Sequence, residues 1–456
     1  MIAGTTALLR RRRIVASQTA RHFIGFRLSV MMFLQYAIWG AWLPLLWLFL
    51  KDHRGFEAAQ IGNMFAIGAV GALVAPFVAG QIADRYFSTE KFLGISHILG
   101  GILVWQLARL DGYWEFLGFS LAYSLIYAPT LPLTNSLAFH HLLDRDREFG
   151  RIRVWGTVGW IVVGIAIGQW LLWQHTPGAG SPEEIAAAQV AGMADAFRLS
   201  GIMGILMGIY CFTLPHTPPS AGKRKSATLE ALREVKRNPL LMLFLLAVPI
   251  SCIHQFYFVH TAGFLQGFQA QAGGFTNFIS KIFGVGGGGL MTIGQMSEIA
   301  VLALIPLVAK KISRKSLLTV GILAYALRMF LFGYGQSIAD STGIPLVLIL
   351  ITGVALHGLC FGCFIFVAFM IVDEETAGDV RASAQSLFNL VIVGIGIVVG
   401  SKIATGVADW AAVDDGINYT RLFSVPMWAS LACLLVLIVF YPRGKRKGVA
   451  RESATA

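Results

Sequence analysis

The middle of the chain reads His216-Thr-Pro-Pro-Ser-Ala-Gly-Lys-Arg-Lys-Ser-Ala-Thr-Leu-Glu-Ala-Leu-Arg-Glu-Val-Lys-Arg-Asn238. This hydrophilic stretch opens with a Pro-Pro breaker and then becomes basic. On both sides of it, apolar runs of about 20 residues recur, each long enough to cross a bilayer. Six runs precede it and six follow, which predicts an all-α membrane protein with 12 transmembrane helices in two six-helix halves. The predicted spans lie near 27–50, 60–83, 92–109, 114–140, 152–174, 195–214, 239–267, 289–309, 316–337, 343–370, 383–408 and 420–441.

The same plan sets the expected domain boundaries. Within the linker, Leu229, Leu232 and Val235 are spaced as on one helix face, so Thr228–Arg237 is predicted to form a short amphipathic helix on the membrane surface. Two pseudo-symmetric halves would place a substrate site between them near mid-membrane. Some other arrangement of twelve spans is the alternative. We expect a basic N-terminal tail over 1–26, a six-helix bundle over 27–214, a linker over 215–238, a second bundle over 239–442 and a basic tail over 443–456.

The composition excludes several classes of protein. Of the 456 residues, 56% are hydrophobic and 13% are charged, whereas soluble domains carry about 25% charged residues. Soluble enzymes and nucleic-acid-binding modules are therefore not expected, despite the net charge of +12. Most of the 36 Lys and Arg fall on one side of the predicted bundle, which the positive-inside rule assigns to the cytoplasm with both termini. The far side receives Lys51, Arg54, Arg109, Lys281 and Arg421.

Polar side chains inside the spans are candidates for function, because a charge at the bilayer centre is costly. Glu298 is the only carboxylate well inside a predicted span, and Gln295 lies three residues earlier on the same helix face. Arg153, Thr157 and Trp160 form a second stripe. Further candidates are Gln35 with Trp39 and Trp42, His254 with Gln255, and His357 with Phe361.

Such a set of residues suits a small, uncharged ligand that is rich in hydroxyl and amide groups. Amides and guanidinium groups bind hydroxyls and base edges, and aromatic rings stack on flat ligands. The alternative is that these polar groups pair with each other and hold helices together. For Arg328, in the middle of span nine, this structural interpretation is favoured.

The loop after span two carries the sequence Gly80-Gln-Ile-Ala-Asp84-Arg85. It resembles the signature of the major facilitator superfamily between its second and third helices. The resemblance implies a gating role: Gly80 allows close helix packing, and Asp84 and Arg85 help to latch the cytoplasmic side. An ordinary solvated loop with positive-inside charge is the alternative.

Several stretches, among them Arg151-Ile-Arg-Val-Trp-Gly-Thr-Val-Gly159 and Gly294-Gln-Met-Ser-Glu298, resemble the nucleoside:proton symporter family, which includes the bacterial nucleoside permeases. The resemblance covers nearly all spans and leaves out the tails and two loops, 175–193 and 268–288. The Arg-x-Trp-Gly-Thr and Gln-x-Ser-Glu motifs are fairly specific to this family. The matching stretches are Phe33-Leu-Gln-Tyr-Ala-Ile-Trp-Gly-Ala-Trp42, Tyr127-Ala-Pro-Thr-Leu131, Arg151-Ile-Arg-Val-Trp-Gly-Thr-Val-Gly159, Gly294-Gln-Met-Ser-Glu298 and Val380-Arg-Ala-Ser-Ala-Gln385.

The resemblance implies which residues bind substrate. In the family, helix five supplies an Arg, a Thr and an aromatic residue to the nucleoside site, helix seven a Gln, and helix eight a Gln and a Glu. Because Glu298 is the only carboxylate well inside a predicted span, it is also the expected proton-coupling residue. Together with the aromatic and polar stripes, the expected substrate-binding residues are Gln35, Arg153, Thr157, Trp160, Gln255, Phe258, Gln295, Glu298, His357 and Phe361.

Two positions depart from the family pattern. Phe258 stands where the family has a substrate-contacting Asn in helix seven. In helix ten the family has Tyr-x-x-x-Phe-Asp, and this chain has His357-Gly-Leu-Cys-Phe361-Gly362, so the carboxylate is missing. Either the substrate differs from ordinary nucleosides, or proton coupling rests on Glu298 alone.

The resulting hypothesis is a secondary transporter that imports nucleosides by proton symport through alternating access in a bacterial inner membrane. Its partners would be the nucleoside, protons and the lipid bilayer. The alternatives are proton-coupled uptake of another hydroxylated solute, such as a sugar, and a membrane sensor that does not transport. An enzyme is least expected, because no catalytic or phosphate-binding motif is present. We expect no cofactor and no metal; Cys360-x-x-Cys363 is assigned to packing, and Phe283–Leu290 to a mobile external loop.

Overall fold

The structure is a computed structural model that describes residues 23–78, 87–142, 145–218, 235–271, 274–308, 311–376, 381–414 and 416–442. Three features expected from the sequence lie wholly or mainly outside these residues. They are the two basic tails, most of the linker with its amphipathic helix, and the gating residues Gly80, Asp84 and Arg85.

A helix is present in each of the twelve predicted spans. Two of these helices are α3 (Ala58–Val78), in the second predicted span, and α5 (Thr89–Leu107), in the third. Ten helices of the described chain are long and apolar enough to cross a membrane. They cover Phe23–His53, Tyr113–His141, Glu148–Gln174, Pro182–Cys211, Leu240–Gln269, Gly288–Ile305, Arg314–Thr342, Leu346–Glu375, Leu387–Trp410 and Tyr419–Phe440. The chain is therefore a multi-pass membrane protein.

The described residues form two compact units. The first lies within Met1–Lys223 and Phe258–Thr292, and the second within Arg224–Tyr257 and Ile293–Ala456. The division thus passes through two helices, α12 (Leu240–Gln271) and α14 (Gly288–Val308), as well as through the linker.

The first unit contains the span Phe23–His53, which ends in a 3-10 turn η1 (Leu43–Leu45), a short helix α2 (Leu46–Leu48) and a π-helical turn η2 (Phe49–His53). Its other helices are α3, α5, α6 (Tyr113–Tyr127), α7 (Thr130–His141), α8 (Arg145–Gln174), α9 (Pro182–Gly192), α10 (Ala194–Cys211) and α13 (Phe275–Phe283).

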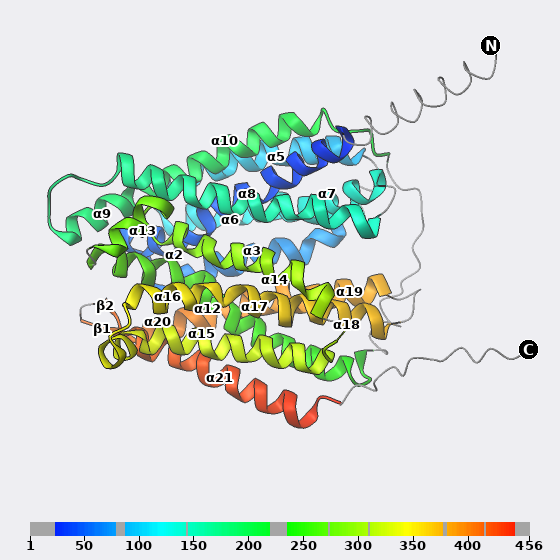
Figure 1. The fold of residues 1–456 in the computed structure, drawn as a ribbon. Coiled ribbons are helices and arrows are strands. Elements are labelled where there is room, and N and C mark those ends of the chain that lie inside the picture. Colours follow the sequence, from blue (N-terminus) through cyan, green and yellow to red (C-terminus); the bar gives the residue numbers. More distant parts are fainter. Residues whose placement is uncertain are drawn as a thin grey trace, which may run out of the picture. The chain divides into compact units, whose positions relative to one another are not determined.

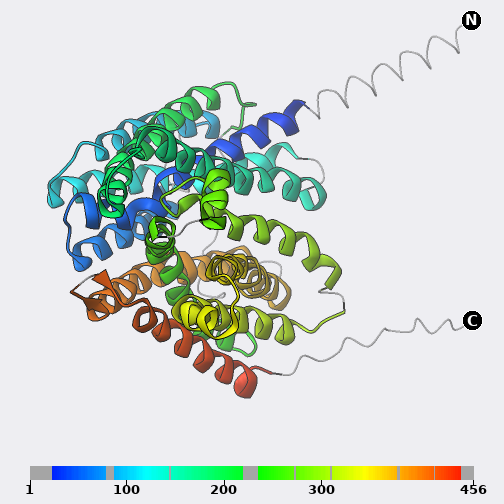
Figure 2. The same ribbon diagram turned by 60° about the vertical axis from the view of Figure 1, so that its left-hand side comes forward.

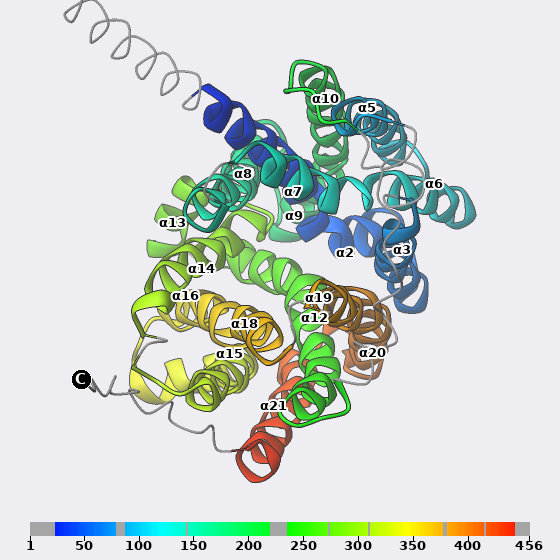
Figure 3. The ribbon, with the colours of Figure 1, turned by 90° about the vertical axis from the view of Figure 1, so that its right-hand side faces the viewer.

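Helices α5 and α10 of the first unit lie side by side (Figures 1 and 3). Small residues make this close approach possible. A Cβ added to Gly101 would lie 2.7 Å from the carbonyl oxygen of Gly201, and one added to Gly208 would lie 2.7 Å from that of Gly94. Small residues at helix interfaces are typical of membrane proteins, where close packing replaces the hydrophobic effect as the source of association.

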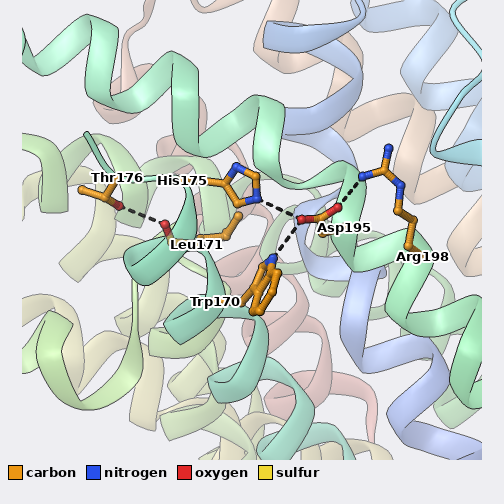
Figure 4. Close-up of polar contacts among 6 residues, drawn as sticks. All are labelled: Trp170, Leu171, His175, Thr176, Asp195 and Arg198. Carbon is orange, nitrogen blue, oxygen red and sulfur yellow. Dashed lines mark hydrogen bonds and ion pairs between the residues drawn. The ribbon is translucent and has the colours of Figure 1, made fainter. Parts of the chain in front are cut away.

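One end of α8 is tied to the start of α10 through a carboxylate. Asp195 accepts hydrogen bonds from Trp170 Nε1 at 2.8 Å and from His175 Nε2 at 2.9 Å, and it also pairs with Arg198 (Figure 4). Aromatic, imidazole and guanidinium groups therefore converge on one acceptor. This cluster connects two helices of the same unit and contains none of the residues predicted to bind substrate.

The second unit is built around α15 (Arg314–Thr342), which lies alongside α21 (Tyr419–Phe440) (Figure 2). Its tenth span changes helix type in the middle, where an α-helix gives way to a π-helix. Such π-helical turns are rare and occur often at functional sites. In chain order, the elements of the second unit between α15 and α21 are α16 (Leu346–Ala355), α17 (His357–Cys360), the π-helix η4 (Phe361–Phe366), α18 (Val367–Glu375), α19 (Arg381–Asn389), η5 (Leu390–Ile395), α20 (Gly396–Trp410) and the antiparallel strands β1 (Ala412–Val413) and β2 (Gly416–Ile417).

The glycine-rich stretch Phe283–Leu290, predicted to be a mobile external loop, contains the end of α13 and the start of α14 with a hydrogen-bonded turn between them. The N–H of Val285 donates to the carbonyl of Gly168 at 3.1 Å. The side chain of Gln269 donates to the carbonyl of Gly284 and accepts from the N–H of Gly287. Gly284 and Gly287 have positive φ angles of 77° and 75°, which side-chain-bearing residues rarely adopt. The glycines therefore hold a fixed turn before α14 begins at Gly288.

Candidate functional site

Arg153, Thr157 and Trp160 lie on α8 in the first unit, and all three side chains are half-buried. The guanidinium carbon of Arg153 lies 4.0 Å from the centre of the Tyr36 ring, which is a close cation–π contact. Tyr36 belongs to the first span and is also half-buried. The contact holds the side chain of a charged residue in place and leaves its guanidinium donors able to bind another group.

Glycines of α8 and of the first span position the face of α8 that carries Arg153 and Trp160. A Cβ on Gly156 would lie 2.5 Å from the Tyr36 ring, and a Cβ on Gly159 would lie 2.2 Å from the carbonyl oxygen of Phe33. From the opposite side, a Cβ on Gly40 would meet the backbone of Trp160 at 3.0 Å. Three glycines therefore let α8 and the first span approach closely, which fixes the positions of Arg153 and Trp160.

Phe258 belongs to the first unit and meets Trp160 edge to face. The ring centres are 6.4 Å apart and the planes are inclined by 75°. Both rings are half-buried. Where the family pattern has an amide, this chain therefore has a second aromatic ring beside Trp160, and the pair offers flat apolar surface rather than hydrogen bonds.

Gln35 is fully buried, and both groups of its amide are engaged within the first unit. Its Nε2 donates to Thr130 Oγ1 at 2.9 Å, and its Oε1 contacts His97 Nε2 at 2.9 Å. The hydroxyl of Tyr127 donates to the Gln35 carbonyl. In this structure the Gln35 side chain is therefore occupied in holding helices together, and we do not include it in the proposed site.

The second unit contains a cluster of three charged or titratable residues, Arg328, His357 and Glu298, with His357 in the middle. The side chain of His357 lies between Arg328 and Glu298: its Nδ1 is 3.1 Å from Arg328 Nη1, and its Nε2 is 3.6 Å from Glu298 Oε2. Arg328 is completely buried, and the Glu298 side chain is 14% exposed. The three residues come from α17, α15 and α14.

Aromatic rings surround this cluster. Tyr257 stacks on His357 with ring centres 4.5 Å apart, and His254 stacks on His357 at 5.4 Å. Tyr257 and Tyr325 also lie against the guanidinium of Arg328, at 4.5 and 5.1 Å from its central carbon. The cation is thus stabilised by two ring faces.

Glycines again bring the polar residues together. A Cβ on Gly358 would lie 2.4 Å from backbone and side-chain atoms of Ser297, so α17 and α14 pack backbone to backbone beside Glu298. A Cβ on Gly294 would meet the Tyr257 hydroxyl at 2.7 Å. The close approach of these helices places His357 next to the carboxylate.

The amide residues of the second unit are buried. Gln295 is 5% exposed, and its Oε1 has no hydrogen-bond partner within the described chain. Gln255 is also buried and lies against Gly400 of α20. Phe361 is half-buried at the first position of the π-helix η4. An unsatisfied buried acceptor such as Gln295 Oε1 is costly, and a ligand donor would satisfy it.

The position at which the family pattern has an acid has no room for a side chain in this structure. A Cβ on Gly362 would lie 2.6 Å from Val301 Cγ1 and 3.2 Å from Ile305 Cδ1 of α14. Gly362 therefore faces an apolar part of α14 rather than the polar cluster. Among the residues that the structure describes, no group of three or more His, Cys, Asp or Glu is placed to hold a metal ion.

The aromatic residues that organise both groups are hard to recognise in the sequence. Tyr36, Tyr257 and Tyr325 contact the two arginines, yet none was singled out. One signal was available, because Tyr325 precedes Arg328 by three residues and so lies on the same helix face. The contacts of Tyr36 and Tyr257 join different helices and leave no local pattern.

Comparison with known proteins places the chain among transporters. A family model described as nucleoside H+ symporter matches residues 23–446. The putative nucleoside transporter YegT of Escherichia coli (strain K12) is 31% identical over 421 residues, which cover 90% of this chain and 91% of that protein. The xanthosine permease of the same organism is 28% identical, with 92% and 95% covered.

A solved structure shows the same fold. The crystal structure of the nucleoside transporter NupG superposes with a TM-score of 0.77 at 22% sequence identity, covering 91% of this chain and 98% of the other. This likeness shows that the chain has the helical fold of that transporter, as the predicted fold class requires. By the match of the family model over nearly the whole chain and by the identity to YegT, the chain belongs to the nucleoside H+ symporter family.

Proposed function

We propose that this protein imports nucleosides by proton symport, through alternating access, across a bacterial inner membrane, with both termini in the cytoplasm. Membership of the nucleoside H+ symporter family supports the reaction. The excess of Lys and Arg on one side of the predicted bundle supports the orientation. The names of the relatives, a nucleoside transporter and a xanthosine permease, support a nucleoside as the substrate class.

The observation that carries this proposal is the arrangement of Arg153 over Tyr36 in the first unit. A guanidinium that is held by an aromatic ring loses little rotamer entropy on binding, and it donates well to the carbonyl groups of a base or to hydroxyls. Trp160 and Phe258 add ring surface on which a flat base stacks. We assign Thr157 to the same group, as a hydroxyl one helical turn after Arg153.

The second unit contains hydrogen-bond acceptors of its own. The unsatisfied Oε1 of Gln295 and the partly exposed carboxylate of Glu298 are both suited to accept hydrogen bonds from ribose hydroxyls or base N–H groups. Gln255 adds a further amide. We assign proton coupling to Glu298, because it is the carboxylate that lies well inside a span and it has contact with a buried imidazole.

The test is uptake of radiolabelled uridine and xanthosine by proteoliposomes that contain the purified protein. We expect accumulation when the outside is more acidic than the inside, and collapse of that accumulation when a protonophore removes the gradient. Liposomes without protein and liposomes with Arg153→Ala are the controls.

Two results would contradict the proposal. Uptake that is unaffected by the pH gradient would exclude proton symport. Accumulation of a sugar but of no nucleoside would favour the alternative of another hydroxylated solute, and the arrangement around Trp160 would then have a different ligand.

A further inference from the structure

Arg328 is a buried cation that the proposed function leaves without a role. Its side chain is fully buried on α15, and its Nε and Nη2 have no hydrogen-bond partner within the described chain. Its Nη1 contacts Nδ1 of His357 at 3.1 Å. Because a charge inside a membrane protein is costly, its presence points to a function rather than to packing alone.

The contact with Arg328 determines which nitrogen of His357 carries the hydrogen. A guanidinium has donors and no acceptor, so Nδ1 of His357 must accept. The hydrogen of the neutral imidazole then lies on Nε2. This nitrogen faces Glu298 Oε2 at a distance of 3.6 Å, so the ring directs its N–H towards the carboxylate.

The same contact prevents His357 from taking up a proton. An imidazolium would turn the N–H of Nδ1 against the N–H of Arg328 and would add a second positive charge beside the first. Glu298 is the carboxylate that faces the ring. The other titratable groups that face the ring or lie on the elements packed against it are His254 and Tyr257 from α12, Tyr325 from α15, Cys360 from α17 and Cys363 from η4.

We propose that His357 is a positioning residue for proton coupling: Arg328 fixes its tautomer, and its Nε2–H holds the Glu298 carboxylate until a proton arrives. The proposal rests on the proton symport put forward above. It gives His357 a role different from the substrate contact that the family resemblance implied. It also explains how one acid is controlled when Gly362 supplies no second one.

The proton step involves a single bond. The incoming proton adds to one oxygen of Glu298 and forms an O–H group, while His357 stays neutral and no other bond is made or broken. Loss of the negative charge weakens the contact with Nε2–H, because the attraction between the N–H and a carboxylate at 3.6 Å is electrostatic and depends on that charge. The ring then holds the protonated Glu298 side chain less strongly.

Infrared difference spectroscopy of the full-length protein in lipid nanodiscs tests this arrangement. The carboxyl band of Glu298 is assigned by its loss in Glu298→Gln, and its intensity is followed against pH. His357→Phe keeps a ring against Tyr257 and removes the donor, whereas His357→Gln keeps an amide N–H. We expect the protonation midpoint of Glu298 to rise by about one pH unit in His357→Phe, a tenfold change in proton affinity. In His357→Gln it should stay close to that of the wild type.

Two outcomes would overturn the proposal. Equal midpoints in all three proteins would show that His357 does not hold the carboxylate. Equal shifts in both variants would show that ring packing matters and the donor does not. Uridine uptake by the same proteins separates this inference from the proposed function. Without gradient-driven uptake in the wild type the proposed function falls, while the infrared midpoints still decide the role of His357.

A measurement on the wild type keeps the proposal testable if His357→Phe does not fold. Nitrogen NMR of the protein labelled in its histidines reports the tautomer of each ring, and the His357 signal is assigned by its absence in His357→Gln. We expect a neutral ring with hydrogen on Nε2 throughout the range from about pH 5 to 8, in which histidines usually titrate. A ring that becomes imidazolium in this range would refute the proposal.

Discussion

The guanidinium of Arg153 lies closer to the ring of Tyr36 than any other cation lies to an aromatic ring within the described residues, at 4.0 Å from the ring centre. The two residues come from α8 and the first span, which glycines hold together. A cation that is fixed in this way is oriented before a ligand arrives. This preorganisation is the reason to expect that Arg153 contributes to binding more than to folding.

Arg153→Ala should weaken nucleoside binding by about 1.5–3 kcal/mol, the usual cost of removing a charged hydrogen-bond donor. Calorimetric titration of the purified protein with uridine measures the change. Because the Arg153 side chain is only half-buried, the melting temperature should change little. An Arg153→Ala protein that binds as tightly as the wild type would make Arg153 a structural residue.

Gly159→Ala should disturb the same site through the backbone. The added methyl group would lie 2.2 Å from the carbonyl oxygen of Phe33. This oxygen belongs to the backbone, which cannot move aside as a flexible side chain could. We expect a lower melting temperature and loss of uridine uptake. Gly118→Ala, in α6, is the matched control, because nothing lies within 4 Å of its added Cβ. Alanine there improves helix propensity, so its stability should be equal or higher. Similar losses in both variants would contradict this account.

The helices and the acid inside a span could be predicted from the sequence, because a membrane protein needs long apolar runs and rarely places a charge within them. Twelve apolar runs gave the positions of the helices, and Glu298 was recognisable as an acid inside a span. The turn at Gly284–Gly287 could not be distinguished from a mobile loop, because its order depends on Gly168 and Gln269.

The contacts of His357 were equally hidden from the sequence. Its place between Arg328 and Glu298 depends on three helices that approach each other in space. The spacing of Gln35, Trp39 and Trp42 indicated a polar helix face, but not that the amide of Gln35 is already satisfied by His97 and Thr130. Local periodicity shows which face is polar, and tertiary contacts decide whether that face is available.

Asp195→Ala should destabilise the first unit. The carboxylate accepts hydrogen bonds from Trp170 and His175 and pairs with Arg198. Its loss leaves a donor of α8 and one of the residue that follows α8 without their acceptor, and we expect a cost of about 1–3 kcal/mol in the free energy of unfolding. Differential scanning fluorimetry in detergent measures the change. Glu183→Ala, at the exposed start of α9, is the control and should leave stability unchanged. An unchanged melting temperature in Asp195→Ala would show that the cluster of Figure 4 contributes nothing to stability.

Glu90 should make the stability of the first unit sensitive to acid. It lies in the first turn of α5, before the predicted span. Burial alone would raise the pKa of Glu90, but hydrogen bonds from the Thr217 N–H and from His216 outweigh it, so the pKa is lower than its ordinary value of 4.5. The stabilisation is therefore fully present above the pKa of the unfolded chain and is lost as pH falls through the lower pKa of the folded state.

Melting temperatures between neutral and acid pH test this prediction. The decrease on acidification should be smaller in Glu90→Gln than in the wild type, because the amide does not titrate. Glu115→Gln, which alters an exposed side chain, should behave like the wild type. An acid-induced decrease of the same size in Glu90→Gln would assign the sensitivity to other groups.

Glu298→Gln should separate exchange from accumulation. The amide keeps the size of the side chain and an acceptor oxygen that can face His357, but it carries no titratable proton. Counterflow, in which labelled uridine exchanges against unlabelled uridine without net proton movement, should therefore persist in this variant. Concentrative uptake driven by an imposed pH gradient should disappear, because Gly362 supplies no second acid to take over. Both assays are run on the same proteoliposomes, so that loss of protein cannot imitate loss of coupling. If Glu298→Gln still accumulates uridine against its gradient, the proton enters through another group, and His254, which lies against His357, becomes the first residue to test.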